Sequence, residues 1–269
     1  MLDRYECYEL CVQSARHVDA FLRGVHGGRP VVLREDFCGT GAVARRWCRE
    51  PGSRAVCVDL DPDALARLRR DGAGVLDRID ARREDAITAP VRKDDACDAI
   101  FVGNFSIGYI RERAALIEYL RRSHERLAMG GAGFGGGVFA CDTYGGAGAF
   151  RLGGFTRRHP GRGREVIDYT WVHEEADPRE ASVVNSISFR VLIDGEVVQE
   201  LPRAFEYRWR LWSIAELREA MLEAGFASVE VYKDINVAPG HAPRPVGAAA
   251  ELGEDWIVMV VAREGIRGS

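Results

Sequence analysis

The chain has 269 residues, of which 46% are hydrophobic and 29% charged, which suits one large α/β domain with a sizeable buried core. Its net charge of −4 argues against nucleic acid as a partner, and no apolar run approaches the roughly 20 residues that cross a membrane. The seven cysteines form no Cys-x-x-Cys pair and residues 1–6 lack the shape of a signal peptide, so we expect no metal site and a reducing, cytoplasmic location.

The first half of the chain alternates between predicted helices and predicted strands. Apolar residues at spacings of three and four predict a helix over 4–23, and short apolar runs predict strands over 31–33, 55–60, 78–85, 99–102 and 138–141. Helices are predicted over 42–49, from Pro62 with Asp61 as its cap, and over 113–127. This alternation predicts an α/β, doubly wound, mostly parallel sheet with both faces covered.

The pattern changes in the second half. Residues 166–211 have no helical period, and we expect antiparallel strands over 166–173, 182–193, 196–201 and 203–211, with a tight turn at Asp194-Gly195. A helix over 214–224 and strands over 229–232 and 256–262 follow. Residues 150–212 are therefore expected to be an antiparallel β insertion after the fifth strand. Two segments rich in Gly or Pro, 130–137 and 239–253, are predicted loops.

A glycine turn carries the first chemical signal. Gly39 and Gly41 follow a strand and open a helix, which fits a nucleotide fingerprint, and Asp59 ends the next strand where a carboxylate can accept from ribose hydroxyls. NAD and S-adenosylmethionine fit these features equally. Glu35 and Asp36 favour the second, because they would repel a pyrophosphate but attract a sulfonium and an ammonium. Asp85 adds an acceptor for the adenine amine.

With these residues, the chain resembles class I S-adenosylmethionine-dependent methyltransferases. Its FCGTG and NFS segments resemble those of a small-molecule-like subgroup. The segments that carry the resemblance are VLREDFCGTGAVA, AVCVDLD, REDA, DAIFVGNFSIGY and ACDTYGG. In that family the first motif reads E/D-x-G-x-G-x-G, and Phe37 stands here at its first glycine. The resemblance implies a seven-stranded Rossmann-like sheet that ends in a reversed hairpin, with residues 1–269 forming a single methyltransferase domain.

The resemblance also implies S-adenosyl-L-methionine as cofactor, and it carries the family's contacts onto residues of this chain. Arg34 is expected at the methionine carboxylate, although a salt bridge to a nearby acid explains it equally well. Tyr5, Tyr8 and Gln13 of the first helix are expected to close over the cofactor. The remaining expected cofactor contacts are Glu35, Phe37, Cys38, Gly39 and Gly41 in the turn, Asp59 and Leu60 at the ribose, Asp85 and Ala86 at the adenine, and Asn104 and Phe105 beside the sulfonium.

The acceptor is expected beyond the carboxyl ends of the strands, under a roof formed by residues 150–212. Methyl transfer is an in-line displacement, so a base is needed only if the acceptor must lose a proton. His173 is the first candidate because it titrates near neutral pH, and Tyr144 and Asp142 are comparable candidates. His173 can equally be an ordinary packed histidine, and the alternating aromatic residues of the roof can equally be sheet core.

We therefore predict methyl transfer from S-adenosylmethionine to N, O or C of a small molecule. One alternative is a methyltransferase that acts on protein or RNA, which the arginines between 151 and 164 keep open. A nicotinamide-dependent oxidoreductase and a non-catalytic binding domain with the same fold are the others. The sequence leaves the acceptor and the oligomeric state undetermined.

Overall fold

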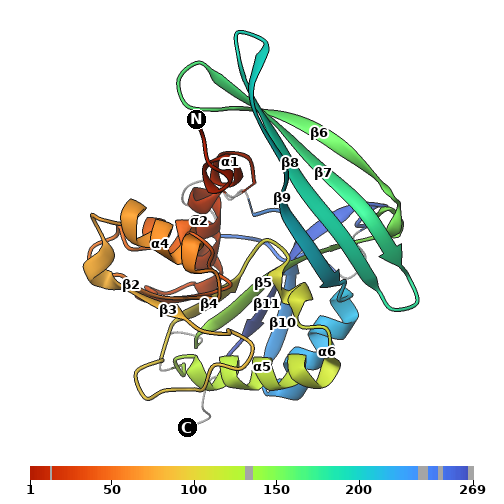
Figure 1. Ribbon diagram of the computed structural model, residues 1–269. Coiled ribbons are helices and arrows are strands. Elements are labelled where there is room, and N and C mark those ends of the chain that lie inside the picture. Colours follow the sequence, from red (N-terminus) through yellow and green to blue (C-terminus); the bar gives the residue numbers. More distant parts are fainter. Residues whose placement is uncertain (13, 131–135, 236–241, 248–250, 266–269) are drawn as a thin grey trace.

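The computed structural model describes residues 1–12, 14–130, 136–235, 242–247 and 251–265. Its main feature is a seven-stranded sheet in the order β3-β2-β1-β4-β5-β11-β10 (Figure 1). Only β11 runs against its neighbours, β5 and β10, so the other strands are mutually parallel. The predicted doubly wound sheet with a reversed final strand is confirmed. Its strands are β1 Val32–Asp36, β2 Arg54–Asp59, β3 Ile79–Arg83, β4 Ala99–Val102, β5 Val138–Gly145, β10 Ser228–Tyr232 and β11 Trp256–Arg263.

Helices cover both faces of this sheet. Phe21 of α2, Trp47 of α3 and Leu65 of α4 are buried on one face, while Leu120 of α5 and Met221 of α6 are buried on the other. Strand side chains alternate between these two apolar clusters, as the period of two requires. The helices are α1 Arg4–Cys11, α2 Ala15–His26, α3 Ala42–Trp47, α4 Pro62–Asp71, α5 Arg113–Arg126 and α6 Ile214–Ala224, with short 3-10 turns at Leu76–Arg78, Ser106–Tyr109 and Ala147–Phe150.

The helix predicted over 4–23 is two helices. A capping box formed by Asp3 and Glu6 starts α1, and a second helix begins at Ala15 after Ser14. The break has a packing reason, because the two helices bury their apolar faces against different sheets. Cys7 of α1 belongs to the cluster under the four-stranded sheet, whereas Phe21 of α2 belongs to the core of the seven-stranded sheet.

The insertion forms a separate antiparallel sheet in the order β6-β7-β8-β9, which stands over one end of the main sheet with α1 beside it (Figure 1). Its strands are β6 Gly153–Pro160, β7 Glu165–Asp177, β8 Ser182–Ile193 and β9 Glu196–Arg210. Asp194 and Gly195 make the predicted turn between β8 and β9, both with positive φ.

Two expectations about this sheet were wrong. The strands expected over 196–201 and 203–211 are one strand, because register shifts against β8 let β9 continue through Pro202 and Arg203. Strand β6 was missed because nearly all its side chains are exposed, so the sequence shows no alternation.

Smaller corrections concern the strand ends. β1 continues to Asp36 and buries the charged residues Arg34, Glu35 and Asp36 within the sheet, whereas only 31–33 were expected. β3 ends at Arg83, so Asp85 lies in the loop beyond it. Of the predicted loops 130–137 and 239–253, residues 131–135, 239–241 and 248–250 lie outside the described residues.

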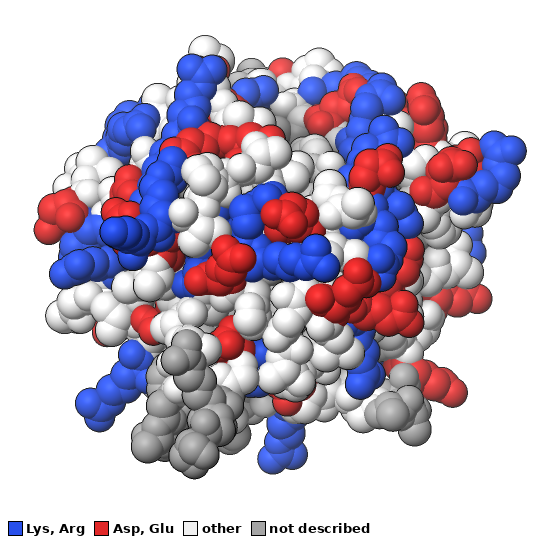
Figure 2. Space-filling view, turned by 90° about the horizontal axis from the view of Figure 1, so that it is seen from below, with Lys and Arg blue, Asp and Glu red and all other residues white. Residues whose placement is uncertain are grey.

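The surface under the main sheet carries charges of both signs. Figure 2 shows acidic and basic side chains interspersed on the face seen from below, over α5 and α6. Arg113 of α5 pairs with Glu223 of α6 at 2.6 Å, and Arg122 pairs with Glu118 at 2.7 Å. Within the described ranges, none of the helices has both the length and the apolar character needed to cross a bilayer.

Candidate functional site

A cavity of about 540 Å³ opens where β1, β2, β3 and β4 end, and α1 and β9 form its opposite wall. The ends of four strands of the main sheet, with the loops that follow them, therefore face two elements from other parts of the chain. The residues that line it are Phe37, Cys38, Gly39, Thr40, Asp59, Leu60, Asp61, Ala64, Glu84, Asp85, Ala86, Ile87, Asn104, Ser106 and Tyr109 on the sheet side, and Tyr5, Tyr8, Phe205 and Tyr207 on the other.

The glycine turn follows β1 directly. Gly39 and Gly41 have φ values of +52° and +62°, in the left-handed region that favours glycine. A Cβ on Gly41 would come within 2.4 Å of Leu68, whereas a Cβ on Gly39 would meet no atom within 4 Å. Gly41 therefore has no room for a side chain beside Leu68, whereas Gly39 leaves open space beside its backbone. A ligand in the cavity can therefore approach the turn closely.

Asp59 ties the turn to the end of β2. Its Oδ2 accepts from the backbone N–H of Gly39 at 2.6 Å, and its Oδ1 accepts from that of Asp61 at 2.8 Å. Burial raises the pKa of Asp59 above its ordinary value. A carboxylate has about four acceptor positions, so these backbone bonds leave acceptor capacity for a hydroxyl group in the cavity.

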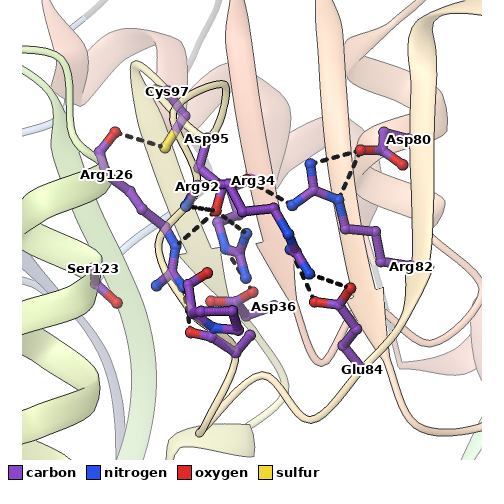
Figure 3. Close-up of polar contacts among 12 residues, drawn as sticks. Arg34, Asp36, Asp80, Arg82, Glu84, Arg92, Asp95, Cys97, Ser123 and Arg126 are labelled. Carbon is purple, nitrogen blue, oxygen red and sulfur yellow. Dashed lines mark hydrogen bonds and ion pairs between the residues drawn. The ribbon is translucent and has the colours of Figure 1, made fainter.

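The carboxylates of Glu35 and Asp36, which precede the turn, contact other groups of the protein. The Oε2 atom of Glu35 accepts from the N–H of Ala44 in α3 at 2.8 Å, and burial raises the pKa of Glu35 to about 8. Side chains alternate along β1, so Arg34 and Asp36 point to the opposite face, where Arg34 Nε lies 2.8 Å from Asp36 Oδ1 (Figure 3). Arg34 is only 1% exposed. Arg34 does not line the cavity, and in this structure it forms the salt bridge to a nearby acid that was the alternative expectation.

A second strained turn follows β4. Asn104 and Phe105 both have positive φ, 55° and 61°, which is uncommon for residues other than glycine. Asp142 of β5 holds both of them, because its Oδ2 accepts from Asn104 N at 2.9 Å and its Oδ1 from Phe105 N at 2.6 Å. Burial raises the pKa of Asp142 to about 7. Strain held this way is characteristic of functional turns.

The expected cofactor residues divide into two groups. Tyr5 lines the cavity, as do nine of the expected set: Tyr8, Phe37, Cys38, Gly39, Asp59, Leu60, Asp85, Ala86 and Asn104. Arg34, Glu35, Gly41 and Phe105 do not line it, although the last three support residues that do. Gln13 lies outside the described residues.

None of the three candidate bases lines the cavity. Asp142 has both carboxylate oxygens engaged by the turn at Asn104. The hydroxyl of Tyr144 accepts from Asn185 Nδ2 at 3.1 Å, and its ring packs on Phe105 at 4.7 Å. His173 lies 6.1 Å from the Tyr144 ring, and burial lowers its pKa. The structure groups these side chains beneath the roof, behind Phe105.

The wall opposite the glycine turn is aromatic. Along β9, Phe205 and Tyr207 stack at 6.4 Å, and Tyr207 stacks on Trp209 at 4.4 Å. Tyr8 of α1 packs edge-on against Phe205 at 5.1 Å, and its hydroxyl shares a hydrogen bond with that of Tyr207. These side chains form an aromatic wall facing the strand ends.

Sequence reasoning missed several residues of the cavity. Thr40, Asp61 and Glu84 each adjoin a predicted site residue, and Phe205 is a missed ring. The period of two along β9 was the available signal for Phe205, since it shares a strand face with Tyr207.

Residues 37–131 match a family model described as a methyltransferase domain, and this segment contains the glycine turn, Asp59 and the turn at Asn104. The match and the seven-stranded sheet both agree with the resemblance to class I S-adenosylmethionine-dependent methyltransferases that the motifs carry. A nicotinamide-dependent oxidoreductase is not favoured. No curated protein is detectably similar in sequence.

Solved structures share the fold at low sequence identity. DesVI from Streptomyces venezuelae superposes with a TM-score of 0.70 at 17% identity, covering 98% of this chain and 100% of DesVI. CalS10 from Micromonospora echinaspora, an amino pentose methyltransferase solved with S-adenosylmethionine, gives 0.66 at 16% identity, covering 98% of each chain. The CcbJ methyltransferase from Streptomyces caelestis gives 0.64 at 19% identity, covering 93% of this chain and 95% of CcbJ. The insertion is therefore part of an architecture that these proteins share along nearly their whole length.

Proposed function

We propose that this chain transfers the methyl group of S-adenosylmethionine to an amine nitrogen of a small molecule. One observation carries the proposal: the cavity joins the glycine turn and Asp59 to the aromatic wall of β9 in one space. The choice of an amine acceptor is supported by three proteins of similar fold. They are the amino pentose methyltransferase CalS10, the sugar N-methyltransferase KedS8 from Streptoalloteichus and the glycopeptide N-methyltransferase MtfA.

The residues present fit the proposed cofactor. The open space beside Gly39 admits the methionine part, Asp59 has acceptor positions for the ribose hydroxyls, and Asp85 with Ala86 would border the adenine. When bound, the cofactor supplies a methyl group already activated by its positive sulfur. Asn104 would lie beside that sulfur, in the turn that Asp142 holds.

The chain's own residues would orient the acceptor and exclude water. The residues of the cavity would hold a neutral amine nitrogen in line with the methyl carbon of the bound cofactor, with water available to take the proton that the methylated amine would lose. Alignment alone can contribute on the order of 7–11 kcal/mol to such a step. In this proposal Asp142 is a positioning residue, residues 150–212 form the roof over the acceptor, and no base is required once the amine is neutral.

We also propose that the reaction takes place in the cytoplasm. The seven cysteines, Cys7, Cys11, Cys38, Cys48, Cys57, Cys97 and Cys141, are all free thiols, as a reducing compartment would keep them.

The experiment has two parts. Calorimetry should detect binding of S-adenosylhomocysteine and no comparable binding of NAD. A screen of primary and secondary amines with methyl-labelled cofactor should then reveal a labelled product, and alcohols of matched shape serve as controls. Tighter binding of NAD would contradict the cofactor, and labelling of the alcohols alone would contradict the amine.

A further inference from the structure

Phe37 stands where the family motif has its first glycine, and its backbone is strained there. Its φ is +55°, in the left-handed region that glycine adopts without cost and a bulky residue rarely enters. A bulky side chain therefore costs stability at this position, and only favourable contacts of the ring that a glycine lacks can offset this cost. The surroundings of the ring indicate which contacts these are.

The ring of Phe37 is half-buried and forms part of the cavity wall. It packs with Ala86, Val56 and Val58 in a small apolar cluster, and it stacks on Tyr109 at 5.9 Å with 25° between the ring planes. Ala86 lines the cavity as well and is only 3% exposed. The ring and Ala86 therefore form one continuous apolar surface at the ends of β1 and β3.

Charged side chains close in sequence to Phe37 and to Ala86 belong to one network of hydrogen bonds and ion pairs (Figure 3). Next to Phe37, Asp36 is held by Arg34 and accepts a hydrogen bond from Tyr119 at 2.8 Å. Next to Ala86, Glu84 makes two hydrogen bonds to Arg92, at 2.7 and 3.0 Å.

The loop beyond Ala86 is held in the same way. Arg122 of α5 donates to the carbonyl of Ile87, and Arg126 donates to that of Ala89 at 2.6 Å. Asp95 joins the parts, since it accepts from Arg82 at 2.6 Å and lies 4.0 Å from Arg34. Backbone carbonyls that leave water need hydrogen-bond partners, and here arginines provide them. The apolar surface is thus held rigid before any ligand arrives.

We propose that Phe37 is a specificity residue for the base of the cofactor: its ring, with Ala86, provides the rigid apolar surface against which the purine packs. This inference rests on the proposed function. Bases stack on aromatic side chains because both present flat π surfaces, and a preformed surface loses little entropy on binding. The glycine of the family motif would offer no such surface.

The test uses two ligands that share the base. S-adenosylhomocysteine contains both the base and the amino acid part, whereas 5′-methylthioadenosine lacks the amino acid. Calorimetry on the full chain should show that Phe37→Gly and Phe37→Leu weaken both ligands by the same factor, about tenfold or more for Gly and less for Leu. Phe37→Tyr keeps the ring and should stay within about threefold of wild type.

A matched control removes a ring elsewhere. Phe155 on β6 is 43% exposed and lies outside the residues that line the cavity, so Phe155→Leu should leave both affinities unchanged.

Phe37→Gly relieves the backbone strain, so its melting temperature should fall less than that of Phe37→Ala. A purely structural role for the ring would follow the opposite pattern, with affinity tracking stability across the variants.

Three results would overturn the inference. Unchanged or tighter binding in Phe37→Gly and Phe37→Leu would mean that the ring does not contact the base. Weaker binding of S-adenosylhomocysteine alone would assign the ring to the amino acid part, and a change confined to the acceptor KM would assign it to the acceptor. If wild type bound neither ligand, the proposed function would fail and this inference with it, which distinguishes the two failures.

Discussion

The two walls of the cavity are built by different means. The strand-end wall consists of turns with positive φ, and partly buried carboxylates fix their backbone N–H groups, as Asp59 does for Gly39 and Asp142 for Asn104. The wall of α1 and β9 consists of rings that pack on one another, such as Tyr207 on Trp209. The first wall depends on individual hydrogen bonds and the second on accumulated contact area.

This difference predicts how each wall responds to substitution. Removing a carboxylate from the strand-end wall leaves buried N–H donors without partners, which costs the full desolvation penalty of each group. Removing one ring from the aromatic wall leaves its neighbours in place and loses only part of a shared surface. We therefore expect large effects on cofactor binding from the first wall and graded effects on the acceptor from the second.

The largest effect is expected from Asp59→Ala. The change removes the acceptor for the N–H groups of Gly39 and Asp61 together with the proposed ribose contact. Hydrogen bonds to charged groups are worth roughly 1.5–3 kcal/mol, so affinity for S-adenosylhomocysteine should fall roughly 10- to 150-fold. Asp63→Ala, at an exposed position in the first turn of the following helix α4, is the control. If calorimetry found the same affinity for S-adenosylhomocysteine in both variants and in wild type, Asp59 would not contact the cofactor.

Tyr207→Leu tests the aromatic wall. Losing one stacked ring should raise the acceptor KM about 2- to 10-fold, and affinity for S-adenosylhomocysteine should stay within about twofold. Val197→Ala, at an exposed position on the same strand, should change neither value. The comparison would break if Tyr207→Leu weakened cofactor binding while acceptor kinetics held, because β9 would then belong to the cofactor site.

The two walls also differed in how far sequence could predict them. Gly39, Asp59 and Asn104 lie at strand ends, so a correct strand order brought them together without any knowledge of side-chain packing. The aromatic wall needs α1 and β9 in contact, and nothing local in the sequence fixes that contact. Strand β9 was predicted in two pieces, and Phe205 was missed with it.

Arg34 illustrates a second limit of the sequence. Reading it as a cofactor contact required knowing which face of β1 it occupies, and β1 was predicted too short to include it. Once the strand reaches Asp36, the alternation sends Glu35 toward α3 and Arg34 toward Asp36. The buried cluster around Asp95 was invisible for the same reason, since its members come from β1, β3 and α5 and meet only in the folded chain.

Glu35→Gln should produce a smaller, pH-dependent effect on stability. Burial raises the pKa of Glu35 to about 8 in the folded chain, so between its unfolded value near 4.5 and pH 8 the folded state binds the extra proton. Wild-type stability must therefore fall across that window as pH rises. A glutamine oxygen can still accept from Ala44 and cannot titrate. Melting temperatures should show the variant gaining on wild type from pH 5 to 8, while Glu125→Gln, at an exposed position, stays parallel to wild type.

The smallest effect is expected from His173→Ala, which tests whether this histidine is a base at all. A general base contributes about 10²- to 10⁴-fold, and its loss removes one limb of the pH–rate profile. His173 does not line the cavity, and burial lowers its pKa, so it is neutral at pH 7 and packs among Tyr144 and Trp171. We therefore expect kcat within about threefold of wild type and an unchanged profile, with a modest loss of thermal stability from the missing ring. A hundredfold loss of kcat together with a lost acidic limb would show that the roof moves during the reaction and delivers His173 to the acceptor, as the sequence first suggested.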